Sequence, residues 1–281
     1  MIRHVLLATT LGLGLGAHVV AQTRQSFEVA SVKPSAPDRV EPESTIPRMV
    51  PANGRLTITN MPLRLLIRIA LDVQDFQISG GPANLMLSKF DISAKAESAT
   101  ALTTKNTLAM LRTLLEDRFK LKTHTESREM PVYALVIARD DGKLGPEMKA
   151  STADCAADEK ACALLPMGRG PGTFGLRATG QPLDGLIQLI TQATGRTVVD
   201  KTGLKGLFDF QLQFDPEVMQ QVAARQGVNA PPLNSTTSSS PPSESPALMT
   251  AIRDQLGLRL DSQRGLVEVL VVDHVEAPTP D

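Results

Sequence analysis

The chain has 281 residues, and its 29 Lys and Arg against 30 Asp and Glu give a formal net charge of −1. A nearly neutral chain lacks the basic surface that nucleic-acid binding needs, so we expect no nucleic-acid partner. It has no Trp and a single Tyr, Tyr133, which disfavours the aromatic stacking platforms of sugar-binding and single-strand-binding proteins.

The N-terminus is typical of a processing segment. Residues 1–21 join a short basic start, "MIRH", to an apolar run that ends in small residues before Gln22. The run is short and interrupted by glycines, so we predict a cleaved signal peptide and no stable membrane span after cleavage. The mature protein is then periplasmic or secreted. Residues 22–53, rich in proline, are expected to form an extended leader.

Residues 54–139 are predicted to form a first α+β repeat. A strand over 54–60 precedes the amphipathic helix of "MPLRLLIRIA", and the strands of "FQIS" and "KFDISAKAE" follow. A second helix, "TLAMLRTLLEDRF", leads into two further strands, "KLKTHTE" and "PVYALVIA". The order of elements is β-α-β-β-α-β-β.

Residues 140–173 separate this repeat from the next. Their Gly- and Pro-rich composition predicts a linker with little regular structure. The two cysteines of the chain, Cys155 and Cys162, lie here in "DCAADEKAC". In an exported protein such a close pair favours a local disulfide. A metal pair or a redox pair is the alternative, but further ligands are not near and the spacing is not that of a redox motif.

Residues 174–276 repeat the same order of elements, and 277–281 form a short tail. "GQPLDGLIQLITQATG" matches "NMPLRLLIRIALDVQD" in its proline and its apolar spacing, which places Leu66 and Leu186 at one core position. A Pro- and Ser-rich insertion, 227–246, interrupts the second repeat and is expected to be disordered. We therefore predict an α+β fold of two tandem repeats, each with two helices packed on a small mixed sheet.

Two aspartates occupy matching places in the two repeats, Asp91 in "FDI" and Asp209 in "FDF". Repetition at equivalent positions favours a role in the fold, such as accepting backbone hydrogen bonds at a hairpin.

Candidate catalytic residues are few. Strand alternation places His124 and Glu126 on one face, where, together with Glu129, they would suit an acid–base pair or a metal site. A polar strand face beside a charged turn is the alternative interpretation. His274 lies beside Asp273 at the end of the last strand and is not equivalent to His124. Because no zinc-peptidase, phosphate-loop or dinucleotide motif is present, we predict no metal and no cofactor.

A weaker candidate for binding is the turn that contains Asp200, Lys201 and Thr202, in "VVDKTGLKGLFDF". A polar turn with two glycines suits a ligand or partner loop. The favoured interpretation is a hairpin in which Gly203 and Gly206 supply positive φ angles.

Several longer strings resemble one known family: "FEVASVKPS", "QISGGPANL", "LLEDRFKLKTHTESREMPVYALVIA", "VVDKTGLKGLFDFQL" and "VEVLVVDHVEAPTP". It is the soil-associated family of exported proteins, abundant in Acidobacteria and treated as a domain of unknown function. The resemblance implies export and fold, but no reaction. Each half also loosely resembles the short N-terminal domain of secretins and TonB-dependent receptors, which implies protein docking.

The leading hypothesis is an exported, non-catalytic module that binds a protein or another component of the cell envelope. One alternative is an envelope hydrolase that uses His124 and Glu126 with a carboxylate of the second repeat, such as Asp200 or Asp209. Another is a sensor domain that holds a small ligand between the repeats.

Overall fold

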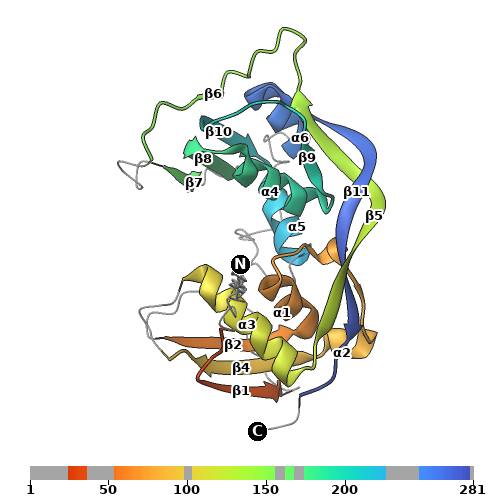
Figure 1. Cartoon of the computed structure of the whole chain (residues 1–281). Coiled ribbons are helices and arrows are strands. Elements are labelled where there is room, and N and C mark those ends of the chain that lie inside the picture. The colour runs from red at the N-terminus through yellow and green to blue at the C-terminus, as the bar shows by residue number, and fades with distance from the viewer. Residues whose placement is uncertain are drawn as a thin grey trace, which may run out of the picture.

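Three small β-sheets and the helices packed on them build two lobes joined by a long two-stranded ribbon (Figure 1). This computed structural model describes residues 25–36, 54–97, 103–155, 162–167, 174–225 and 247–278. The predicted α+β class is confirmed. The predicted signal peptide and the 227–246 insertion lie outside the described residues. Within the described ranges, no helix is both long enough and apolar enough to cross a bilayer.

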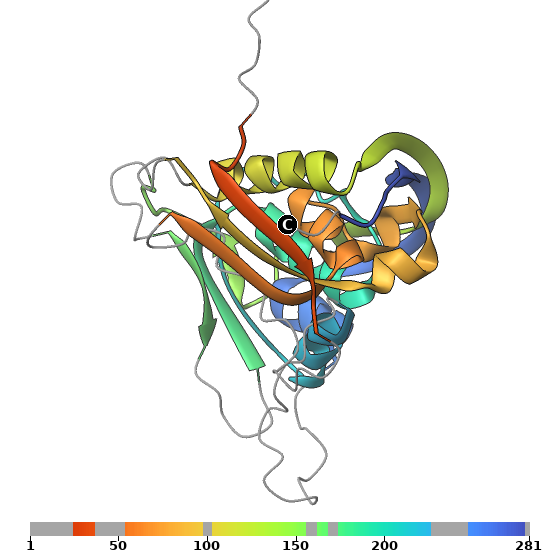
Figure 2. The same cartoon turned by 90° about the horizontal axis from the view of Figure 1, so that it is seen from below.

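The first lobe is an antiparallel sheet of order β1-β4-β2, with helices on one face (Figure 2). Its main elements are β1 (Val29–Pro34), β2 (Arg55–Pro62), α1 (Leu63–Ala70), η1 (Asp75–Gln77), β3 (Ile78–Gly80), α2 (Ala83–Leu87), β4 (Lys89–Lys95) and α3 (Thr104–Arg118). The apolar positions of "LRLLIRIA" fall on the inner side of α1, so Leu66 is fully buried in the core.

The second lobe has an antiparallel sheet of order β6-β10-β8-β7. Its elements are β6 (Met148–Ala150), β7 (Ala163–Met167), β8 (Phe174–Gln181), α4 (Leu183–Thr194), β9 (Val198–Asp200), β10 (Phe208–Phe214), α5 (Glu217–Arg225), α6 (Leu248–Ala251) and the π-helical turn η4 (Ile252–Leu256). Leu186 of α4 is buried in this core.

The described part of 140–173 differs from the expected linker because it contributes β6 and β7 to this sheet. Backbone hydrogen bonds fix the segment before β6: Gly145 donates to Leu256 and Glu147 donates to Gln255, at 2.8 and 2.9 Å. The Gly- and Pro-rich composition of this segment resembles that of a loop. Edge strands are short, so they can be predicted only when the strand that they pair with is known.

One further correction concerns the end of each half. Two strands were predicted there, but each pair is one continuous strand: β5 (Lys122–Ile137) and β11 (Leu258–His274). They pair antiparallel along nearly their whole length, so Met130 faces Gly265 at the centre. The polar centre of each strand, which suggested a turn, lies where the ribbon is exposed between the lobes. Pairing with the other strand keeps its backbone groups hydrogen-bonded.

The long strands cross from one hydrophobic core to the other. β5 begins at the first core, which contains Leu121, and ends at the second, which contains Leu135. β11 runs the opposite way, from Leu258 in the second core to Val272 in the first. Each lobe therefore contains a strand from the other half of the chain.

The parallel pairings also join the halves. β3 of the first half pairs with β11, and β9 of the second half pairs with β5. The sheet β3-β11-β5-β9 is therefore the mixed sheet, whereas the mixed sheet was predicted within each half. In register, Ile78 faces Leu270 and Val198 faces Tyr133. A duplicated unit would give this reciprocal arrangement, but the tandem repeat stays a prediction.

Candidate functional site

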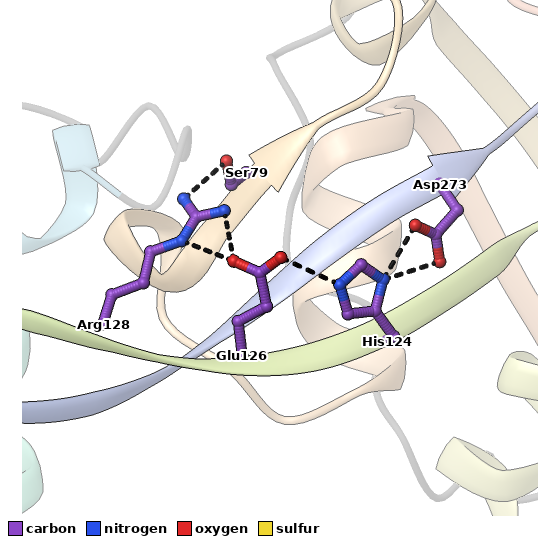
Figure 3. A network of polar contacts seen from close by, with 5 residues as sticks. All are labelled: Ser79, His124, Glu126, Arg128 and Asp273. Atoms are coloured by element: carbon purple, nitrogen blue, oxygen red, sulfur yellow. Dashed lines mark hydrogen bonds and ion pairs between the residues drawn. The ribbon is translucent and has the colours of Figure 1, made fainter.

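The candidate residues of β5 meet the end of β11 on the surface of the ribbon (Figure 3). Side chains of a strand alternate between its faces, so His124, Glu126 and Arg128 share one side of β5. His124 lies opposite Val271 in the antiparallel register. Two residues further along β11, Asp273 comes within reach of the His124 ring.

Both ring nitrogens of His124 contact a carboxylate. Nδ1 lies 2.8 and 2.9 Å from the two carboxylate oxygens of Asp273. Nε2 lies 3.0 Å from Oε1 of Glu126. A neutral imidazole has only one N–H to donate, whereas two carboxylates need two donors. The geometry therefore favours the doubly protonated, positively charged ring.

The network continues beyond Glu126. The guanidinium of Arg128 donates from Nε to Oε2 of Glu126 at 2.9 Å, and its Nη2 lies 2.8 Å from the same oxygen. Nη1 of Arg128 donates to the hydroxyl of Ser79 on β3, at 3.1 Å. One chain of alternating charges thus links β11, β5 and β3.

The electrostatics follow this geometry. Hydrogen bonds to Asp273 and then to Glu126 raise the pKa of His124 above its ordinary value of 6.5. Hydrogen bonds from His124 and then from Arg128 lower the pKa of Glu126 below its ordinary value of 4.5. The side chains are open to solvent, with 48% of His124 and 43% of Glu126 exposed. Solvent screens such pairs, so the network orients strands more than it stabilises them.

This arrangement suits a structural contact better than acid–base chemistry. A general base needs one free ring nitrogen within reach of the proton that it removes. In His124 both nitrogens are already engaged. Across the described part of the chain, no group of three or more His, Cys, Asp and Glu is arranged to hold a metal ion.

The other carboxylates considered from the sequence lie elsewhere. Glu129 accepts from Arg264 across the ribbon at 2.9 Å, and His274 contacts Glu276 at 2.8 Å. The carboxylates of Asp200 and Asp209 each have local partners in the second lobe, and neither contacts His124. The second-half carboxylate that does reach His124 is Asp273.

Asp91 and Asp209 accept backbone hydrogen bonds, as predicted. Asp91 Oδ1 accepts from the N–H of Asn60 at 2.7 Å, and Asp209 Oδ1 accepts from the N–H of Gly180 at 2.9 Å. Both donors have positive φ angles, 53° and 58°, at the irregular end of a strand. The hydroxyl of Ser151 and then the Gly180 N–H lower the pKa of Asp209.

The turn after β9 is held by its own side chains. Asp200 Oδ1 accepts from the backbone N–H and from the hydroxyl of Thr202, at 2.8 and 2.7 Å. Gly203 and Gly206 have φ angles of 71° and 96°, so the predicted positive φ angles are confirmed. The predicted hairpin is wrong, because β9 pairs with β5 while β10 pairs with β6 and β8 in another sheet. A binding role for Asp200, Lys201 and Thr202 stays a prediction.

The predicted disulfide between Cys155 and Cys162 is present and packs against β8. A Cβ atom built on Gly180 would fall on Cys162 Sγ and would come within 2.9 Å of Cys155 Sγ. Glycine at position 180 is therefore required both by its positive φ and by the disulfide beside it.

Comparison with known proteins identifies a family for the chain. Residues 64–275 match the model of the family described as "Protein of unknown function (DUF3738)". No curated protein and no solved structure matches the chain. The match agrees with the expected family of unknown function, while the acidobacterial origin and the likeness to secretins and TonB-dependent receptors stay predictions.

Proposed function

The chain belongs to the DUF3738 family, and from this premise we propose that it is an exported, non-catalytic module that binds an extended segment of a cell-envelope protein through the edge strand β7. The single observation that carries this proposal is the apolar edge that β7 forms, which contains no charged residue. An extended partner segment adds as a further strand to such an edge, and its main chain supplies the hydrogen bonds.

The sequence of β7, "ALLPM", contains no charged residue. Its side chains Leu164 and Leu165 are 38% and 58% exposed. Edge strands that are meant to stay unpaired usually carry charges or other obstacles to pairing, because an exposed apolar edge attracts other strands. Pro166 removes one backbone donor, which confines the pairing surface to the Leu164–Leu165 end of β7.

The other edges of the two antiparallel sheets differ from β7. β1 contains Lys33, β2 contains Arg55, and β6 contains Lys149. Each of these edges therefore has the charged side chain that discourages strand addition. This contrast supports β7 as the docking edge.

The disulfide supports the same edge by fixing the start of β7. Cys162 immediately precedes the strand, and its bond to Cys155 packs against Gly180 of the neighbouring strand β8. A surface that is already ordered loses less conformational entropy when a partner binds. The edge is thus prepared for binding before a partner arrives.

Two observations support the proposed export of the protein and its proposed non-catalytic role. A stable disulfide is compatible with an oxidising location outside the cytoplasm, as the predicted signal peptide implies. Both nitrogens of His124 are occupied by carboxylates, which favours a non-catalytic role over the hydrolase alternative. Export to the periplasm or beyond remains part of the proposal.

A photo-crosslinking amino acid at position 165 tests the docking edge. Introduced into the mature protein in its native envelope, it should form one discrete adduct, and hydrogen exchange of the complex should slow over 163–167. The same crosslinker at position 149, on the charged edge β6, is the matched control and should give no such adduct. Leu164→Lys should abolish the adduct without unfolding the protein, because Leu164 is partly exposed. The proposal is contradicted if proteolytic mapping finds no adduct at residue 165. It is also contradicted if the adduct still forms in Leu164→Lys.

The small-ligand alternative has separate support. Arg68, whose Nε has no hydrogen-bond partner among the described residues, lines a cavity between the lobes.

A further inference from the structure

A small cavity lies between the two lobes, lined by residues of α1 and α4 and of their neighbouring segments. Figure 1 shows the two helices inside the curve of the ribbon. The volume of the cavity is about 160 Å³. The first lobe contributes Arg68, Asp75 and Phe76 to the wall, and the second contributes Thr191, Gln192 and Gly195. Residues far apart in the sequence therefore surround one space, which exists only because the lobes are joined.

Arg68 is the unusual residue of this cavity. Its Nε is buried and finds no hydrogen-bond acceptor among the residues that the structure describes. Burial lowers the pKa of Arg68, and the nearby charge of Asp75 only partly opposes this effect. A buried donor without an acceptor is destabilising, and native proteins contain few of them. Arg68 as a whole is only partly buried and lines the cavity, so a ligand there reaches the guanidinium through its terminal nitrogens and not through Nε.

Asp75 is not the missing partner. Its Oδ1 lies 2.6 Å from Nε of Arg64, which also donates from Nη2 to the backbone oxygen of Asp75 at 2.7 Å. Arg64 therefore holds Asp75 in place beside Arg68. Oδ2 of Asp75 is 3.4 Å from Nη2 of Arg64, at the limit of a hydrogen bond, and retains capacity to accept another donor.

The opposite wall is electronegative. α4 ends at the cavity, where Gly195 adopts a left-handed conformation with φ of 67° as the C-terminal cap. The carbonyl groups at a helix C-terminus carry a partial negative charge and favour cations. The cavity thus combines the guanidinium of Arg68 with two sources of negative potential, Asp75 and the end of α4.

We propose that this cavity binds a small zwitterion, a free α-amino acid with a short side chain. Its carboxylate accepts from Arg68, and its ammonium group lies toward Asp75 and the end of α4. Phe76 provides an apolar contact for the side chain. At about 30 Å³ per water molecule, a cavity of this size holds about five waters, which matches an amino acid the size of glycine or alanine.

A larger hollow offers a contrast. It has a volume of about 310 Å³ and lies beside α3 and the start of β5. Its arginine, Arg112, faces Glu116 one turn along α3, at 3.8 Å. That hollow therefore provides a control arginine that already has a carboxylate nearby.

This inference deepens the small-ligand alternative and does not depend on docking at β7. The test is calorimetry and thermal unfolding of the mature full-length chain with L-alanine, propionate and ethylamine. L-Alanine should bind and raise the melting temperature, because a ligand that binds only the folded state stabilises it. Propionate and ethylamine, each carrying one of the two charges, should bind at least about tenfold more weakly, the loss expected when one buried charged contact is missing.

Arg68→Met should reduce L-alanine binding at least about tenfold, since the carboxylate loses its donor. Its melting temperature without ligand should equal or exceed that of the wild type, because a partly buried guanidinium whose Nε has no acceptor among the described residues has been removed, so lost binding will not reflect unfolding. Arg68→Lys, which keeps the charge without the forked donors, should bind with intermediate affinity. Arg112→Met and Leu164→Lys should bind as the wild type does.

Three results would overturn the inference. One is the absence of heat and of a thermal shift with every probe. Another is L-alanine binding that is unchanged in Arg68→Met. The third is propionate binding as tight as that of L-alanine, which would indicate a simple anion site. A loss of crosslinking at position 165 with intact L-alanine binding would contradict only the docking proposal.

Discussion

His124 joins two long strands by charge rather than by a hydrophobic contact. It lies on β5, while Asp273, the partner of Nδ1, lies on β11. Its raised pKa adds stability that is fully present below the ordinary value of 6.5 and is lost as pH rises through the raised value. The lowered pKa of Glu126 adds stability that is present above 4.5 and is lost as pH falls through the lowered value. Both contributions to stability are therefore fully present between pH 4.5 and pH 6.5.

An NMR titration of the His124 ring tests this description. The ring should titrate above 6.5 in the wild-type protein, because both carboxylates favour its charged form. Asp273→Asn should lower its pKa more than Glu126→Gln does, since the bond to Asp273 has the larger effect. Titration of the wild-type ring at or below 6.5, or a larger effect of Glu126→Gln, would contradict the charge network.

At the scale of single residues, sequence patterns predicted local contacts better than distant ones. The roles of Asp91 and Asp209 followed from their matching positions, since each accepts from a residue in the adjacent strand of its own sheet. The meeting of His124 and Glu126 followed from strand alternation. Asp273 was not identified as their partner because that contact depends on the register between two strands far apart in the sequence.

At the scale of elements, the disulfide packs against β8 at Gly180. Gly180 ends the regular part of β8, donates its N–H to Asp209, and leaves room for the two sulfur atoms. Gly203 provides a natural comparison. It has a similar positive φ of 71°, but nothing lies within 4 Å of the place where its Cβ would stand.

Alanine at these two glycines should therefore have different effects. Gly203→Ala carries only the cost of a left-handed alanine, roughly 1–2 kcal/mol. Gly180→Ala adds overpacking against the disulfide, about 1–3 kcal/mol more. Urea unfolding of the oxidised proteins measures both values. Removing the sulfur atoms with the double substitution Cys155→Ser and Cys162→Ser should shrink the extra loss at Gly180. Equal losses at the two glycines in the oxidised protein would show that the disulfide does not constrain β8.

The helices α1, α3 and α4 and strands such as β2 and β4 could be predicted because their apolar periodicity is local, whereas α2 and α5 were not predicted. The long strands could not, because polar residues at their centres, such as Ser127 and Gln263, resemble a turn when each strand is taken alone. Only the pairing of one polar stretch with the other keeps the backbone extended there. β6 and β7 were missed for the same reason, since edge strands depend on the strand beside them.

At the scale of the whole molecule, the exchange of long strands decides where the candidate sites lie. β5 contributes to the second core and β11 to both cores, so the contact between His124 and Asp273 and the cavity beside Arg68 both combine residues of the two halves. Periodicity in the sequence does not reveal such an exchange, because it predicts which face of a strand is buried but not which core buries it.

Cooperative unfolding is the most direct test of this shared architecture. Leu66 is fully buried in the first core and Leu186 is 1% exposed in the second. Replacing either by alanine should cost about 2–5 kcal/mol. If the exchanged strands make one unit, urea unfolding of the mature chain gives a single transition, and Leu66→Ala and Leu186→Ala each lower its midpoint. Neither substitution then speeds hydrogen exchange in one lobe alone. Two separate transitions, with Leu66→Ala shifting one and Leu186→Ala the other, would contradict it.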